Sequence, residues 1–247
     1  MTPTIEAVWT TTSHHLNCFN QPLLKLLRQQ VTTAQWQYQQ TEDEPCSLDI
    51  AVSLLHKFIL TCEHPIHLIG HGTGGLVSLL YARQCPQKVK SLTLLGVGAN
   101  ASWDWIAHFY YYLQFLHSNR HQLLTQLVSN LFGKQNPSIN YYLAHLLEMD
   151  MGVSPSPHSL FHRHHFQPSG VSVPMLVCGC ENDPVVSSQS LKAWESWMKG
   201  DDRLWQCQDG HHFFHSFYPK PVANEILDFW EISTHPLSTV SLSTCSV

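Results

Sequence analysis

The sequence has few charged residues and no long apolar run. Charged residues make up 13% of the 247 positions, about half of the usual ~25%. The formal net charge is −5, so we do not expect the basic patch of a nucleic-acid-binding protein. No apolar stretch approaches the ~20 residues of a transmembrane helix, so no membrane span is predicted. Apolar residues make up 43%, a composition typical of a folded globular protein.

Targeting and metal-binding signals are also missing. The first residues lack the basic and apolar regions of a secretory signal. Eight cysteines are present, without a Cys-x-x-Cys pair or zinc-ribbon spacing. We interpret them as reduced thiols of a cytoplasmic protein that needs no cofactor or metal. Cys178 and Cys180 share one face of a predicted strand, and we interpret them as small buried hydrophobic residues, with a redox or metal role as the alternative.

Strands and helices alternate along most of the chain. Apolar alternation predicts strands at 5–10, 33–39, 65–69, 89–95, 173–179 and 203–207. Helical spacing predicts helices at 21–30, 47–60, 76–83, 187–198 and 221–230. This order predicts an α/β protein with a mostly parallel central sheet that is covered by helices on both faces.

The alternation is interrupted in the middle of the chain. Between residues 103 and 166 no strand is predicted, and helices are expected at 103–116, 121–132, 139–149 and 158–165. We therefore assign residues 1–98 and 171–232 to an α/β core and 99–170 to a helical insertion. The Ser/Thr-rich segment 233–247 is expected to be a disordered tail.

The segment 66–80 reads IHLIGHGTGGLVSLL, an apolar strand, a glycine-rich turn and an apolar helix. This segment resembles the nucleophile elbow of the α/β-hydrolase superfamily, Gly-x-Ser-x-Gly, and most closely the Gly-His-Ser-x-Gly-Gly form of its capped members. Gly72 stands where those proteins have the nucleophilic serine. The resemblance implies the α/β-hydrolase fold, with the helical insertion as a cap over the site.

The resemblance also implies the other members of a catalytic triad. The superfamily orders them Ser, acid, His. Asp183 follows the predicted strand VPMLVCG, and His211 follows the last predicted strand, with the neighbouring His212 as the alternative. Gly72 has no side chain that could attack a carbonyl, but glycine adopts the left-handed backbone of such a turn without strain.

Other groups could replace the missing serine. Thr73 is implied to supply one backbone N–H of the oxyanion hole, and its hydroxyl is an alternative nucleophile. The second donor of that hole usually comes from a His-Gly loop, which the matching segment 10–15 lacks. A water molecule activated by His211 and Asp183 is the third alternative.

The insertion is rich in aromatic and histidine residues. Capped relatives bind small apolar or aromatic ligands beneath the cap, so we expect Trp103, Trp105, Phe109 and Tyr112 to line a pocket, or else to join cap and core or contact a protein partner. A histidine cluster at 158–165 is interpreted as a polar face, with metal binding as the alternative.

Two functions are compatible with these residues. The first is a pseudo-hydrolase, which keeps the fold, has lost serine-type hydrolysis, and binds a small ligand or a protein partner. The second is an enzyme, a hydrolase, lyase or oxygenase-like protein, in which His211 and Asp183 act as a general base. A further alternative is an ordinary serine hydrolase in which Gly72 has replaced the native serine.

Overall fold

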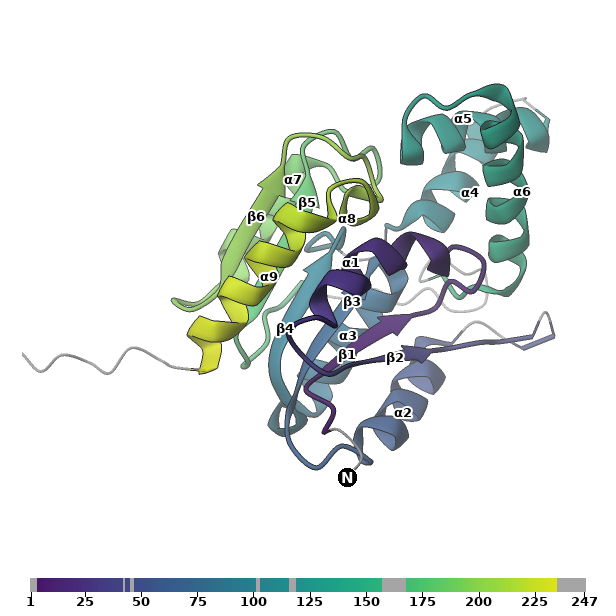
Figure 1. The fold of residues 1–247 in the computed structure, drawn as a ribbon. Coiled ribbons are helices and arrows are strands. Elements are labelled where there is room, and N and C mark those ends of the chain that lie inside the picture. Colours follow the sequence, from purple (N-terminus) through teal and green to yellow (C-terminus); the bar gives the residue numbers. More distant parts are fainter. Residues whose placement is uncertain are drawn as a thin grey trace, which may run out of the picture.

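The computed structural model describes residues 4–41, 43–44, 47–100, 103–115, 119–156 and 168–234. Six parallel strands form one sheet in the order β2-β1-β3-β4-β5-β6 (Figure 1). Their bounds are β1 Ala7–Thr11, β2 Thr33–Gln37, β3 Ile66–His71, β4 Val89–Leu95, β5 Met175–Cys180 and β6 Arg203–Cys207. Every predicted strand is thus present, and the predicted parallel sheet is confirmed.

Helices cover both faces of this sheet. Their bounds are α1 Gln21–Leu27, α2 Leu48–Ile59, α3 Gly72–Gln84, α7 Ser188–Lys192, α8 Phe214–Phe217 and α9 Pro219–Thr234. Short 3₁₀ helices span Asn17–Asn20, Pro86–Lys88 and Ala193–Trp197. Side chains of α1 and α9 pack on one face, and side chains of α2, α3 and α7 pack on the other. Two apolar cores therefore sandwich the sheet, as expected for strands that are joined by right-handed crossovers.

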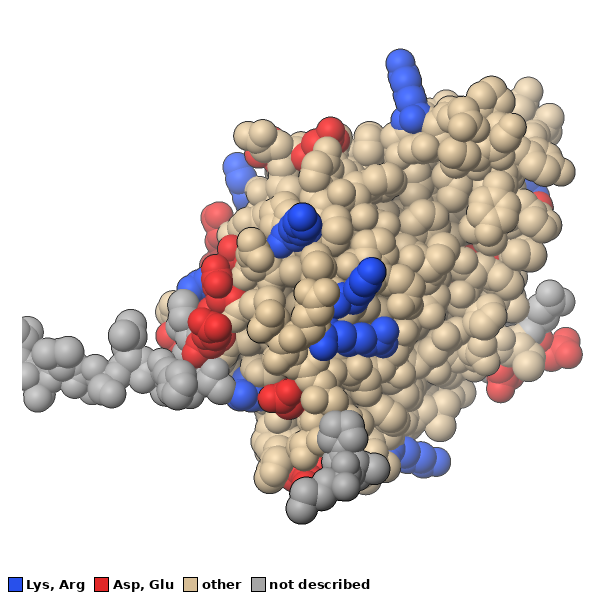
Figure 2. All heavy atoms as spheres, in the orientation of Figure 1, with Lys and Arg blue, Asp and Glu red and all other residues tan. Residues whose placement is uncertain are grey.

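Helices α4 Trp105–Phe115, α5 Arg120–Phe132 and α6 Pro137–Val153 are inserted between β4 and β5. They share a third apolar core, which also includes Leu16 and Phe213 from the two loops that border the sheet. In Figure 1 the three helices stand above the carboxyl ends of the central strands. On the face that Figure 2 shows, few charged side chains lie over them.

Some predictions fall outside the described residues. The predicted helix and histidine cluster at 158–165 lie within 157–167, and the tail beyond Thr234 lies within 235–247. Four-residue α8 was not predicted, because a single turn leaves no periodic signal in the sequence. Among the described residues, no helix is both long enough and apolar enough to cross a bilayer.

Candidate active site

The glycine-rich turn joins β3 to α3 with very little space. A Cβ atom built on Gly70 would lie 2.5 Å from the Gly75 nitrogen, and one on Gly74 would lie 2.5 Å from the Thr10 carbonyl oxygen. Only glycine fits at these positions, because real Cβ atoms do not approach backbone atoms so closely. The turn thus brings the start of α3 against the ends of β1 and β3.

At position 72 the backbone conformation favours glycine, whereas the neighbouring atoms leave room for a side chain. The φ of Gly72 is +52°, a left-handed conformation that glycine adopts freely and other residues adopt at a cost. The nearest atom to a Cβ built here is His212 Nε2, at 3.8 Å. A side chain at position 72 would therefore point at this imidazole, and its next atom would be within hydrogen-bonding reach of the ring nitrogen.

The carboxyl ends of β5 and β6 bring an acid and a histidine together. Asp183 lies just beyond β5, and its Oδ2 accepts a hydrogen bond of 2.9 Å from His212 Nδ1. Both side chains are fully buried. The other carboxylate oxygen, Oδ1, accepts from the backbone N–H groups of Val185 and Val186 at 2.8 and 3.2 Å. These three bonds fix the acid, and the acid fixes the orientation of the imidazole ring.

The partner of Asp183 is therefore His212 and not the predicted His211. His211 has φ +53° and follows Gly210 at +129°. This double left-handed turn directs the His212 side chain inward. The His211 backbone N–H bonds the side chain of Asn182, and the His211 ring lies beside Gly133, where an added Cβ would be 2.9 Å from its Nε2.

His212 Nε2 is buried, and it has no hydrogen-bond partner among the described residues. Since Nδ1–H donates to Asp183, Nε2 of the neutral ring is an acceptor. A buried acceptor without a donor costs about 1–3 kcal/mol. The position that this acceptor faces is the one where Gly72 lacks a side chain. The local chemistry therefore favours a hydrogen-bond donor at this point.

Thr73 follows Gly72 at the start of α3, but its hydroxyl is already used. It donates a hydrogen bond of 2.5 Å to Asp104 Oδ2. Asp104 is buried, precedes α4, and accepts at Oδ1 from the Ala107 backbone N–H at 2.8 Å. Burial raises the pKa of Asp104, and the bond from Thr73 opposes that rise. Thr73 thus ties the turn to the first of the inserted helices.

Asp104 did not emerge from the sequence pattern. We expected a helix to begin at 103, and Asp104 would then be an ordinary residue of its first turn. The helix instead begins at Trp105, with Asp104 in the position before it. An aspartate directly ahead of an apolar helical run is a typical start signal and would have identified Asp104 as a helix cap, although not as the partner of Thr73.

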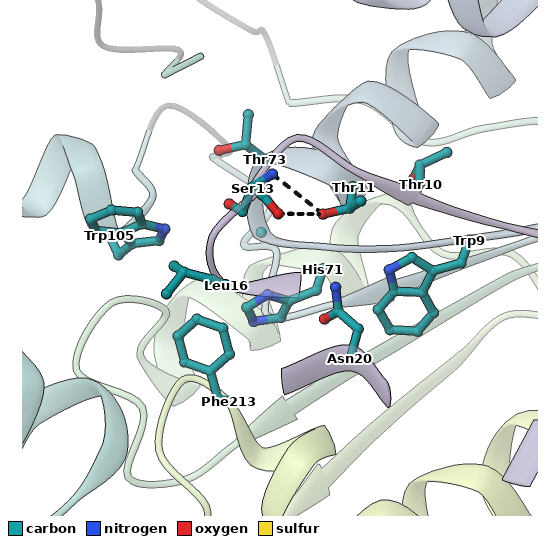
Figure 3. Close-up of a pocket in the computed structure, with 11 residues that line it drawn as sticks. Trp9, Thr10, Thr11, Ser13, Leu16, Asn20, His71, Thr73, Trp105 and Phe213 are labelled. Atoms are coloured by element: carbon teal, nitrogen blue, oxygen red, sulfur yellow. Dashed lines mark hydrogen bonds between the residues drawn. The ribbon is translucent and has the colours of Figure 1, made fainter. Parts of the chain in front are cut away.

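His71 holds the backbone of His212 in place. Its Nε2 donates to the carbonyl oxygen of His212 at 2.9 Å, and its ring lies between Asn20 and Phe213 (Figure 3). Burial lowers the pKa of His71 well below its ordinary value, and the neighbouring imidazoles of His215 and His212 lower it further. His71 is therefore a neutral ring that positions the His212 backbone.

Two small cavities border Gly72. One of about 20 Å³ lies between β1 and the turn and is lined by Trp105 among others. The other, about 10 Å³, is lined by Trp103 and Asp104 together with the turn. Each is about the size of one water molecule. The structure therefore places Trp103 and Trp105 beside the glycine-rich turn, and a ligand pocket lined by them stays a prediction.

Phe109 and Tyr112 do not line these cavities. Phe109 is buried in the apolar core of the three inserted helices. Tyr112 is exposed, and its ring packs on His108 at a centroid distance of 4.5 Å. Neither residue therefore occupies the predicted place in a pocket, and Phe109 instead helps to join the inserted helices to Leu16 and Phe213, which was the alternative role.

Two curated proteins are similar to the chain over almost its whole length. Uncharacterized protein alr2406 from Nostoc sp. is 41% identical over 232 residues, which is 94% of this chain and 93% of that protein. Uncharacterized protein sll0249 from Synechocystis sp. is 38% identical over 230 residues, 93% of this chain and 92% of that protein. The chain belongs to their family. No family model matches the chain.

Solved structures agree with the architecture. The meta-cleavage product hydrolase from Pseudomonas fluorescens IP01 superposes with a TM-score of 0.70 over 92% of this chain and 90% of its own, at 11% identity. An esterase from Exiguobacterium antarcticum gives 0.68 over 93% of both chains, at 15% identity. The chain thus has the α/β-hydrolase fold, as the resemblance of its glycine-rich turn implied.

Proposed function

We propose that this protein is a non-covalent member of its fold, which has lost serine-type hydrolysis and binds a small ligand at the retained dyad of Asp183 and His212. The observation that carries the proposal is the relation between Gly72 and His212. The imidazole points at the place of a nucleophile, at 3.8 Å from where a Cβ would be, and glycine has no group that could attack. An acyl-enzyme requires such a group.

Thr73 does not replace the missing serine. Its hydroxyl donates to Asp104 and not to His212, the imidazole that would have to take the proton of a nucleophilic hydroxyl in a triad of this kind. Breaking this bond would leave the buried Asp104 with one partner fewer, at a cost of about 1–3 kcal/mol. Thr73 is therefore assigned a structural role in the proposal.

The ligand in this proposal carries a hydroxyl or an amine. His212 Nε2 is an acceptor that lacks a partner among the described residues, so a donor is favoured opposite it. A carboxylate ligand would instead bring a second acceptor close to Nε2 and to the buried Asp104. The two cavities at Gly72 hold about one water molecule each, so any larger ligand requires the inserted helices, acting as a cap, to move.

An enzyme without a covalent intermediate is the second candidate function. The hydrogen bond between His212 and Asp183 favours it, because at 2.9 Å it orients the ring as a general base. The donor bound at Nε2 would then be a water molecule or the substrate's own hydroxyl, which loses a proton to the ring. The six described cysteines are free thiols, which supports a reducing, cytoplasmic setting for either function.

A fluorophosphonate probe, which phosphorylates activated serines, tests the proposal. Incubation followed by intact-mass measurement is expected to leave the native protein unmodified. The Gly72→Ser variant should gain one adduct, and the adduct should disappear when His212→Ala is added. Labelling of the native protein at any residue of the site would overturn the proposal.

Thermal shift measurements test the class of ligand. Small alcohols and primary amines are expected to raise the melting temperature of the native protein and not that of Gly72→Ser, whose own hydroxyl would occupy Nε2. Small carboxylates serve as matched controls and should have no effect on either protein. Equal shifts in the two proteins would contradict binding at His212.

A further inference from the structure

Two cysteines face each other at the carboxyl end of the sheet. Cys180 is the last residue of β5 and Cys207 the last of β6, and the two are partners in the parallel register. Side chains of paired residues lie on the same face of a sheet. Neighbouring strands are ~4.8 Å apart, within the ~4.4–6.8 Å range of Cα separations that a disulfide accepts.

The two thiols differ in exposure but contact each other. Cys180 is buried, whereas Cys207 is partly exposed. The contact between the two side chains lowers the pKa of Cys180 and, together with burial, raises the pKa of Cys207. The buried sulfur is therefore the better thiolate of the pair, and the accessible sulfur is the one that an external reagent meets first.

The thiols also hold the two loops that carry the dyad. Cys180 donates to Asn182 Oδ1 at 2.9 Å, and Cys207 donates to the Asp209 carbonyl oxygen at 3.1 Å. Asn182 and Asp209 are themselves joined by a hydrogen bond of 2.6 Å. Oxidation of the thiols would remove both S–H donors from this bridge.

Cys178 provides an internal comparison. It lies two residues before Cys180 on the same face of β5, and it is fully buried. Its register partner on β6 is Trp205, so it has no thiol opposite. Burial raises the pKa of the Cys178 thiol well above its ordinary value.

We propose that Cys180 and Cys207 form a dithiol site that external disulfides oxidise to an intramolecular disulfide. The Cys180 thiolate takes the proton of the Cys207 thiol as the Cys207 sulfur attacks one sulfur of the reagent. The reagent S–S bond breaks, and the first thiol leaves as a thiolate that takes a proton from water. The Cys180 sulfur then attacks the Cys207 sulfur of this mixed disulfide and expels the second thiol, which takes the proton that Cys180 holds. Two electrons pass from the cysteine pair to the reagent, and the site does not depend on the function proposed for His212.

The test uses the full reduced chain and an excess of oxidised glutathione. After thiol blocking, intact mass and a peptide map are expected to show the loss of two hydrogens and a cross-link between the Cys180 and Cys207 peptides. The Cys178→Ser variant is the matched control and should behave like the native protein. Cys180→Ser should stop at a mixed disulfide on Cys207, and Cys207→Ser should form no cross-link.

Phenylarsine oxide is a second probe, because its arsenic atom binds two neighbouring thiols at once. The native protein and Cys178→Ser are expected to bind one equivalent that excess monothiol does not remove, while each of the other two variants loses this binding. A native protein that stops at a mixed disulfide, or a peptide map that pairs Cys180 or Cys207 with another cysteine, would overturn the proposal.

Discussion

A Cβ atom at Gly72 would lie 3.8 Å from Nε2 of His212. The imidazole thus points at a position that holds no side chain, while its other nitrogen is hydrogen-bonded to Asp183. A buried histidine that is held by an acid thus faces a turn that has no nucleophilic side chain. This relationship links the shape of the turn to the function that we propose, and both residues can be changed separately.

The first prediction concerns the backbone of the turn. Gly72→Ala is expected to reduce the free energy of unfolding by about 1–2 kcal/mol, because φ is +52° and a left-handed non-glycine residue costs that much. No clash adds to this cost, since the nearest atom is 3.8 Å from the new Cβ. Urea unfolding measures it. Gly200→Ala, where a Cβ meets nothing within 4 Å, is the control, and an equal effect of the two changes would contradict the strain argument.

The second prediction distinguishes the neighbouring histidines. His212→Ala removes the buried partner of Asp183 and is expected to cost about 3–5 kcal/mol of unfolding free energy. His211→Ala keeps the backbone bond to Asn182 and should change it by no more than about 0.5 kcal/mol. Urea unfolding of both variants measures the difference. A larger loss of unfolding free energy in His211→Ala than in His212→Ala would contradict the assignment of His212 as the buried partner of Asp183.

The third prediction concerns the bond between Thr73 and Asp104. Thr73→Val removes the hydroxyl donor and is expected to cost about 1–3 kcal/mol, whereas Thr73→Ser keeps the donor and should be close to native. Burial raises the pKa of Asp104 and this bond lowers it, so its loss raises the pKa further. When a carboxyl group has a higher pKa in the folded than in the unfolded protein, the folded state loses stability as the pH rises through that pKa. Urea unfolding at pH 5 and pH 8 should thus show that Thr73→Val loses more unfolding free energy at pH 8 than at pH 5. Equal losses at the two pH values would contradict the bond's effect on the pKa of Asp104.

The fourth prediction concerns stability in acid. Burial lowers the pKa of His67 to about 3, and its ring is stacked on Trp230 at 4.5 Å. The unfolded chain protonates histidine near pH 6.5, so it binds more protons than the native state between about pH 6.5 and pH 3. The unfolding free energy should therefore fall as the pH is lowered through this window, by about 1.4 kcal/mol per pH unit for each such histidine.

His67→Gln should have a shallower pH dependence of stability between pH 6.5 and pH 3 than the native protein. His64→Gln changes an exposed histidine and is the matched control, which should keep the native slope. Urea unfolding at several pH values provides the comparison. If both variants keep the native slope, the buried ring of His67 does not contribute to it.

The sequence predicted the sheet well because its signals are local. Apolar alternation located all six strands, and the glycine-rich turn located Gly72 between β3 and α3, although α3 begins at Gly72 itself and not at the predicted residue 76. The insertion was recognised because its helices lack strand periodicity. Boundaries such as the start of α4 differed by about two residues, since helix ends depend on capping contacts.

The sequence could not choose correctly between adjacent or facing residues. The choice between His211 and His212 depends on two successive positive φ angles, which residue types alone do not fix. Asp104 was missed because its partner, Thr73, is distant in the sequence. The pair of Cys180 and Cys207 depends on the register between β5 and β6; the sequence instead drew attention to Cys178.

Hydrolysis of p-nitrophenyl acetate tests the central claim most directly. Four proteins are compared: the native chain, His212→Ala, Gly72→Ser, and Gly72→Ser with His212→Ala. We expect only Gly72→Ser to be active above background, and its rate to fall by about 10²–10⁴-fold in the double variant, which lacks the general base. Activity of the native protein that is lost in His212→Ala alone would contradict the account, because the site would then attack esters without a serine at position 72.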